Sequence, residues 1–283
     1  MKRQQLLVIT GGLLLLVSLL VFGKRVPDKK EQTASAATAK DDHSFDIKAM
    51  IASEKEHLTA SQQAYLNSVE AGVVRGDVKN QQIHVYHQLA QFWLDSVGRP
   101  EPYGYYTAEA AKLENSEKSL TFAAQLFLKN LRAVADPGLK SWMATEAKGL
   151  FEKALALNPA NDSARIGLGS SYIFGSSAED PQEVMQGIQQ ILQVAKKDSN
   201  NMYAQLMLGI GGVVSGQYDR AIDRLNKVLS FQPQNLEALL TLAEAYERTG
   251  AKADAVRCYE SAKKMIKIPE VLKEIDERIQ QLK

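Results

Sequence analysis

The apolar residues of this chain follow two different patterns. Residues 6–23 form one uninterrupted apolar run without a charged side chain, whereas apolar residues from residue 45 onward recur at spacings of three and four. The second pattern is typical of amphipathic helices, so it predicts an all-α protein. Residues 24–44 lie between the two patterns, are mostly polar and are predicted to be a flexible linker.

Residues 1–23 are predicted to be a signal anchor, that is, a single N-terminal transmembrane helix. The apolar run would reach about 27 Å as a helix, close to the thickness of a bilayer core. It is longer than the apolar core of a cleaved signal peptide and is followed directly by Lys24 and Arg25. Cleavage near residues 34–36 is the alternative.

The orientation of this anchor depends on which signal is weighed more heavily. A count of the basic residues on its two sides would place the large domain in the cytoplasm. The basic start and apolar run at the N-terminus instead resemble an export signal. We favour a bacterial inner-membrane protein with its helical domain in the periplasm.

Residues 45–115 are predicted to form divergent helical hairpins. Their clearest helical periodicity lies in residues 77–98. The stretch at residues 99–106 is rich in proline and glycine and is predicted to be a loop, after which Thr107 would cap a new helix. Residues 269–283 carry one apolar stripe and are predicted to be a C-terminal capping helix.

Two copies of one pattern, shifted by 34 positions, occupy residues 202–269. Small residues recur where two packed helices would cross, and glycine recurs where a helix would end. The matched pairs are Gly209 with Ala243, Gly216 with Gly250, Ala221 with Ala255, and Leu225 with Tyr259.

This period and these matched positions resemble the tetratricopeptide repeat (TPR), a helix–turn–helix unit that stacks into a solenoid. Less regular copies extend upstream, where Gly169 and Gly187 fall at small positions and residues 175–181 lengthen one inter-helix loop. The first helix of the earliest unit is expected to end near Pro137. The resemblance implies about three to four units over residues 116–268, arranged as helical hairpins in a right-handed superhelix.

The resemblance also implies a site, because the first helices of TPR units line a concave face. Carried over by aligned position, this groove would be apolar in its middle and acidic toward the C-terminus. The predicted groove residues are Ile166, Ser170, Ile173, Phe174, Tyr203, Leu206, Ile210, Val213, Val214, Glu237, Leu240, Glu244, Glu247 and Arg248. Such a surface suits a peptide with apolar anchors, although the chain's own N-terminal helices or a second copy could also cover it.

Composition and motifs suggest no further chemistry. The net charge of +1 argues against a nucleic-acid partner, and Cys258, the single cysteine, cannot form an intramolecular disulfide. His84 and His87 lack the spacing of a zinc-protease motif, and the glycine-rich residues 209–216 lack the lysine of a phosphate-binding loop. We therefore predict no catalytic, metal or cofactor site, and no enzyme.

The predicted function is that of a membrane-anchored TPR scaffold that binds a protein or peptide in its concave groove. A homo-oligomer would be compatible with this function. The main alternative is an assembly factor for cytochrome c maturation or for another envelope protein. The order of anchor, linker and repeats resembles that of such factors, although no specific motif supports the resemblance. An enzyme that carries the repeats as an accessory is a third hypothesis, for which residues 45–115 offer no catalytic motif.

Overall fold

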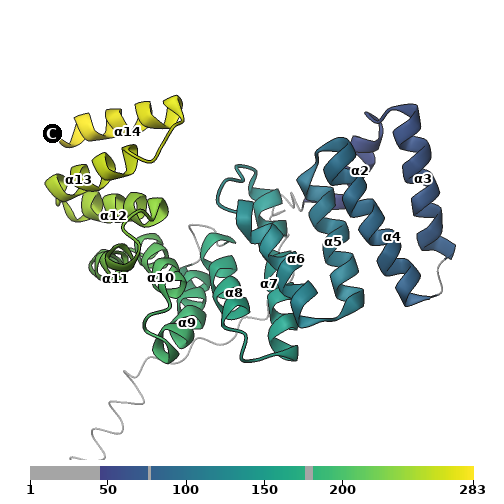
Figure 1. Ribbon diagram of the computed structural model, residues 1–283, viewed down its shortest axis with the longest axis horizontal. Helices are drawn as coiled ribbons and strands as arrows, with labels where there is room; N and C mark the ends of the chain where they lie inside the picture. Colours follow the sequence, from purple (N-terminus) through teal and green to yellow (C-terminus); the bar gives the residue numbers. More distant parts are fainter. Residues whose placement is uncertain (1–44, 76–77, 176–180) are drawn as a thin grey trace, which may run out of the picture. The chain divides into compact units, whose positions relative to one another are not determined.

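A computed structural model describes residues 45–75, 78–175 and 181–283 of the chain. In these residues the structure consists of thirteen α-helices and one π-helical turn, and it contains no strand (Figure 1). The elements are α2 (Ile47–Lys55), α3 (Ala60–Arg75), α4 (Lys79–Phe92), η1 (Trp93–Val97), α5 (Pro100–Glu114), α6 (Glu117–Asn130), α7 (Pro137–Leu157), α8 (Asp162–Gly175), α9 (Pro181–Lys197), α10 (Met202–Val214), α11 (Tyr218–Phe231), α12 (Leu236–Thr249), α13 (Lys252–Lys263) and α14 (Pro269–Leu282).

The predicted membrane anchor and linker, residues 1–44, lie outside the described residues. Among the helices that are described, none combines the length and the apolar character needed to cross a bilayer.

Consecutive helices from α4 onward pack in pairs. The pairs are α4 with α5, α6 with α7, α8 with α9, α10 with α11, and α12 with α13. The second helix of each pair packs on the first helix of the next, and α8 contacts both α6 and α10. Each hairpin thus buries its apolar face against its neighbours, as a helical solenoid requires.

The predicted loop at residues 99–106 is wrong, because α5 begins at Pro100. Proline at the start of a helix does not break it, since its missing N–H would have had no helical partner there. Gly104 lies at a tight contact, because a Cβ at this position would lie 3.1 Å from the ring of Phe127. Thr107 is not a cap but lies within α5, where its hydroxyl donates a hydrogen bond to the carbonyl oxygen of Tyr103 at 2.7 Å.

The expectation that a helix ends near Pro137 is wrong in the same way. Helix α6 ends at Asn130, and Pro137 begins α7. The carboxylate of Asp136 caps α7 by accepting a hydrogen bond from the backbone N–H of Leu139 at 2.6 Å. Pro137 therefore marks the start of the following helix.

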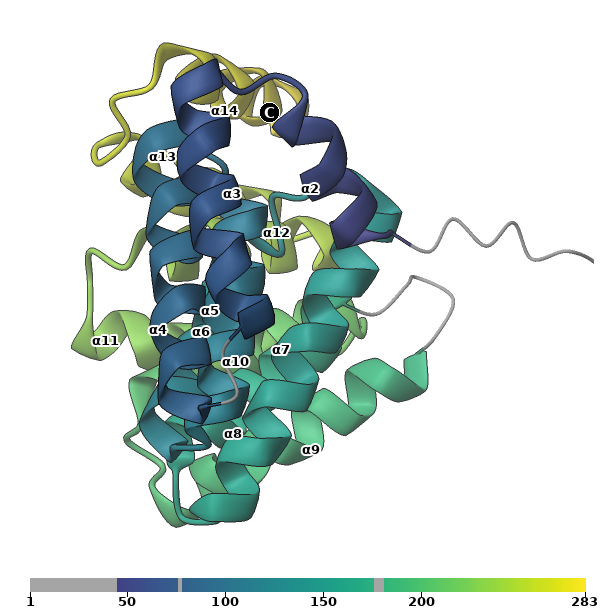
Figure 2. The same ribbon diagram turned by 90° about the vertical axis from the view of Figure 1, so that its right-hand side faces the viewer.

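Helix α2 leaves the regular pairing and packs against α5. Just before α2, the ring centroid of Phe45 lies 5.3 Å from that of Trp142 in α7. The ribbons of α2 and α7 can be followed in Figure 2. The N-terminal helices thereby share one apolar cluster with α5, in which Trp93 is fully buried.

At three junctions between units in the C-terminal half, an asparagine side chain caps the helix that follows. Asn161, Asn201 and Asn235 each accept a hydrogen bond from the backbone N–H three residues later, at 2.8 to 3.0 Å. These contacts satisfy N–H groups that the first turn of a helix leaves unpaired. Gly216 and Gly250 have φ of 73° and 79°, the left-handed conformation that glycine adopts most easily.

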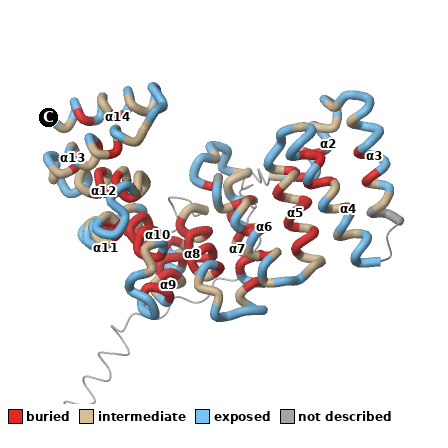
Figure 3. Tube along the Cα trace, viewed as in Figure 1, coloured by how far each residue is buried: buried red, intermediate tan, exposed pale blue. Residues whose placement is uncertain are grey.

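Helices α8 and α10 contain long stretches of buried residues (Figure 3). Close approach of their neighbours explains this burial. A Cβ on Gly187 of α9 would lie 2.4 Å from the carbonyl oxygen of Gly169 in α8, and a Cβ on Gly209 of α10 would lie 2.7 Å from Leu225 in α11. Helix α14 closes the chain by packing Ile275 and Ile279 in one cluster with Tyr259.

Candidate partner-binding site

A surface cavity of about 300 Å³ lies among α8, α10, α11, α12 and the residues that follow α6. It is lined by Arg132, Phe174, Ile210, Val213, Val214, Tyr218, Thr241, Glu244 and Arg248, and we call it the Val214 pocket. Six of these residues belong to the predicted groove, namely Phe174, Ile210, Val213, Val214, Glu244 and Arg248. These six residues come from three helices, α8, α10 and α12, and lie in one cavity.

The apolar part of the Val214 pocket comes mainly from the last turn of α10. Ile210 is buried, with 3% of its surface exposed, whereas Val214 is 52% exposed. Val213 and Phe174 are partly buried and pack against the core beneath. An aliphatic side chain that is half exposed at the edge of a cavity leaves apolar surface available to a partner.

The rim of the Val214 pocket carries charges of both signs. The guanidinium of Arg132 lies over the ring of Phe174, 5.2 Å from its centroid, and forms an ion pair with Glu237 in the first turn of α12. Arg248 lies 3.9 Å from Glu244, and both side chains are exposed. These pairs are accessible to solvent, so they contribute little to stability and their charges can also interact with a partner.

Glu237 also influences the phenol of Tyr203 on α10. Loss of hydration raises the pKa of the Tyr203 hydroxyl, and the neighbouring Glu237 carboxylate raises it further. The phenol therefore stays neutral and can donate a hydrogen bond beside the pocket.

Other predicted groove residues lie in the interior. Ile166, Ser170, Ile173 and Leu206 expose between 0% and 6% of their surface, since α8 and α10 are covered by neighbouring helices. They can support the groove but offer almost no surface to a ligand.

The remaining predicted residues lie at the surface outside the pocket lining or have another partner. Tyr203 is 48% exposed, and Glu237 and Leu240 are half-buried on α12. Glu247 instead binds the C-terminal helix, because its two carboxylate oxygens accept hydrogen bonds from the Arg278 guanidinium at 3.0 to 3.2 Å.

Three pocket residues were missed by the sequence reasoning. Arg132 follows α6, in the earliest predicted unit, for which no groove residue was predicted. Tyr218 is the first residue of a second helix, and Thr241 lies one position beyond the predicted Leu240. A prediction that allowed one position of rotation about α12 would have included Thr241.

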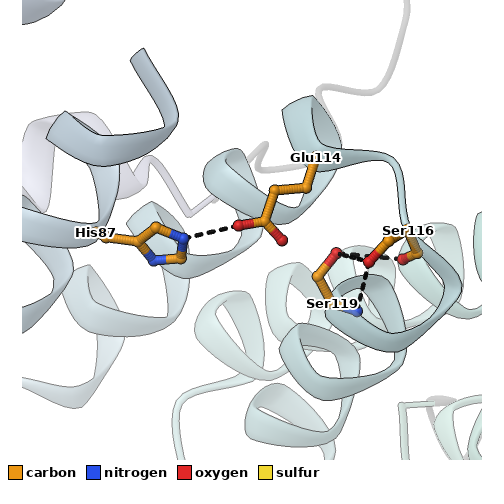
Figure 4. Close-up of polar contacts among 4 residues, drawn as sticks. All are labelled: His87, Glu114, Ser116 and Ser119. Atoms are coloured by element: carbon orange, nitrogen blue, oxygen red, sulfur yellow. Dashed lines mark hydrogen bonds and ion pairs between the residues drawn. The ribbon is translucent and has the colours of Figure 1, made fainter. Parts of the chain in front are cut away.

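No group of three or more histidine, cysteine, aspartate or glutamate residues in the described ranges could hold a metal ion. Burial raises the pKa of the Cys258 thiol, which disfavours the reactive thiolate. His87 lies 2.8 Å from Glu114, in a separate cavity between α4, α5 and α6 (Figure 4).

Residues 215–265 match the family model described as tetratricopeptide repeat. No curated protein matches the chain. The solved structure of a TPR protein from Thermus thermophilus is 16% identical, with a TM-score of 0.51, and the match covers 72% of this chain and 98% of that chain.

Two further solved structures resemble the chain. A tetratricopeptide repeat protein from Parabacteroides merdae is 14% identical, with a TM-score of 0.48 and coverage of 83% of this chain and 98% of that chain. MamA from Desulfovibrio magneticus is 19% identical, with a TM-score of 0.47 and coverage of 67% and 95%.

The family match covers α11, α12 and α13, which line much of the Val214 pocket or pack behind it. The fold shared with the Thermus protein extends the likeness over most of the described helices. The described part of the chain is therefore a TPR-like helical solenoid, in which residues 215–265 match the tetratricopeptide repeat model.

Proposed function

We propose that this chain is a protein-binding scaffold and that the Val214 pocket receives an apolar side chain of a protein or peptide partner. The observation that carries the proposal is the half-exposed Val214 within a cavity that collects six predicted groove residues. TPR units commonly serve protein–protein interaction, which supports the same conclusion.

The size of the pocket favours an anchoring side chain over a free metabolite. Its volume of about 300 Å³ is at the lower end of the range for small-molecule sites. Val214 and the other apolar residues would contact the anchor, while Tyr218 and the charged rim would orient the backbone or polar side chains beside it. A bound apolar residue with flanking charges of both signs would match these features.

Site-specific photocrosslinking in cells tests this proposal. A benzophenone amino acid placed at Val214 should crosslink to one partner. The same group at Phe231, which is 61% exposed at the end of α11 and outside the pocket, should not. Equal crosslinking at both positions, or crosslinking of Val214 only to a second copy of this chain, would refute the proposed partner site.

The affinity of the identified partner provides the second measurement. Val214→Asp should weaken binding about tenfold or more, because it places a charge against an apolar anchor, and tenfold equals about 1.4 kcal/mol. Phe231→Asp changes an apolar residue outside the pocket that is at least as exposed as Val214, and it should leave the affinity unchanged. Unchanged affinity in Val214→Asp would contradict the role of the pocket.

We further propose that residues 6–23 anchor the chain in a bacterial inner membrane, with the helical unit in the periplasm. The charge-free apolar run supports this part of the proposal. Fusions of alkaline phosphatase and of green fluorescent protein after Lys283 would test it in a bacterial host. Active phosphatase with a dark fluorophore is the expected result, and the reverse result would place the helical unit in the cytoplasm.

A further inference from the structure

A second cavity, of about 160 Å³, lies among α4, α5 and α6, away from the residues that form the Val214 pocket. It is lined by His87, Ala90, Gln91, Tyr103, Thr107, Ala111, Glu114, Ser119 and Phe122, and we call it the Glu114 pocket. Its volume is below the usual range for small-molecule sites, so it is suited to a single side chain.

Glu114 supplies the charge of this pocket. Its Oε1 atom lies 2.8 Å from Nε2 of His87, which must donate because an ionised carboxylate can only accept (Figure 4). In the described part of the chain no other hydrogen-bond donor reaches Glu114. The carboxylate is therefore held in place by one contact and keeps free acceptor capacity on its second oxygen.

The position of Glu114 in the helix makes a bound cation favourable. Glu114 is the last residue of α5, where the partial negative charge of the helix terminus opposes a carboxylate. A cationic group beside Glu114 would relieve this repulsion.

Three of the other polar side chains of the pocket are already engaged. The Thr107 hydroxyl donates to the carbonyl oxygen of Tyr103 at 2.7 Å, and Gln91 donates to Asp95. The Ser119 hydroxyl bonds to Ser116 in the cap of α6 (Figure 4). Glu114 is the only carboxylate among the lining residues, so it is the group that can accept from a cationic ligand here.

Two aromatic side chains complete the pocket. Phe122 of α6 is 52% exposed, and Tyr103 of α5 is partly buried. No lysine or arginine is among the lining residues. A carboxylate together with aromatic rings matches a planar guanidinium, which can form a charge-assisted hydrogen bond and stack on a ring face.

We propose that the Glu114 pocket binds an arginine side chain of a partner polypeptide, with Glu114 accepting from the guanidinium and Phe122 stacking against it. The occupant is a side chain and not free arginine, because the lining residues include no cationic group for the α-carboxylate of a free amino acid.

Saturation-transfer NMR titrations of the full-length chain in mild detergent would test this site. The probe is N-acetyl-arginine amide, compared with N-acetyl-citrulline amide, which keeps the shape without the charge, and with free arginine. The blocked arginine should bind at least about tenfold more tightly than the citrulline analogue, a difference of about 1.4 kcal/mol. Free arginine should bind no more tightly than the blocked form.

Variants of the full-length chain assign binding to the pocket. Glu114→Gln and Phe122→Ala should each weaken the arginine probe about fivefold to tenfold, through loss of a charge-assisted contact and of a ring face. Glu152→Gln removes an exposed carboxylate of α7 that does not line the pocket and should have no effect. Circular dichroism would confirm that each variant keeps its helix content.

Three outcomes would overturn the inference. These are equal binding of arginine and citrulline probes, absence of arginine binding, and retained affinity in both Glu114→Gln and Phe122→Ala. Markedly tighter binding of free arginine would overturn the assignment to a polypeptide side chain. Val214→Asp should leave this probe unaffected, so failure of one pocket can be distinguished from failure of the other.

Discussion

Replacing Gly169 by alanine should destabilise the solenoid at the contact between α8 and α9. A Cβ at this position would lie 2.5 Å from Cγ1 of Ile191 and 2.6 Å from the carbonyl oxygen of Gly187. Ile191 is fully buried, and the second contact is to backbone, so neither neighbour can move aside without shifting α9. The substitution therefore forces apart two helices that glycine allows to cross closely.

The expected magnitude is the difference between two opposing effects. Alanine has a higher helix propensity than glycine, which stabilises a helix interior by about 1 kcal/mol. Overpacking of a tight core costs about 1–3 kcal/mol, and a backbone clash places this site at the upper end. Gly169→Ala should therefore lower the free energy of unfolding by about 2 kcal/mol.

Gly149→Ala provides a matched control. Gly149 lies within α7, and a Cβ there would meet nothing within 4 Å. This variant should gain the higher helix propensity of alanine without any overpacking, so it should become more stable by up to about 1 kcal/mol. Urea unfolding of both variants, followed by circular dichroism, gives the comparison. If Gly169→Ala were as stable as Gly149→Ala, the close packing of α8 on α9 would be refuted.

Three further changes have defined outcomes. Asn235→Ala removes the hydrogen bond to the N–H of Ala238 and should cost about 1 kcal/mol in urea unfolding, whereas an unchanged midpoint would argue against the cap. Gly250 has φ 79°, so Gly250→Ala should lower the free energy of urea unfolding by about 1 kcal/mol. Gly250→Asn should lower it less, because asparagine adopts the left-handed conformation more easily than alanine. Burial, and then Glu247, raise the pKa of Tyr259. The stability this adds is present below the ordinary tyrosine pKa of about 10 and is lost as pH rises through the folded-state pKa. The free energy of unfolding of Tyr259→Phe should therefore fall less with rising alkaline pH than that of the unchanged chain. Parallel falls of the two free energies with pH would contradict this prediction.

The sequence by itself determined the features that depend on neighbouring residues. Helical periodicity and a 34-residue period predicted the hairpins of the C-terminal half, and Gly216 and Gly250 adopt the left-handed conformation expected of them. These features are local, because helix formation and helix termination are set by residues within a few positions. Local chemistry was ambiguous at Pro100 and Pro137, which begin helices although proline can equally follow the end of one.

Only the tertiary structure decided which surface positions belong to a site. Arg132 reaches Glu237, 105 positions later in the chain, and so completes the rim of the Val214 pocket. Arg278 engages Glu247, a predicted groove residue, from the final helix. Helix periodicity predicts which face of a helix is apolar, but the helix that covers this face, and the charges that reach it, depend on how successive hairpins stack.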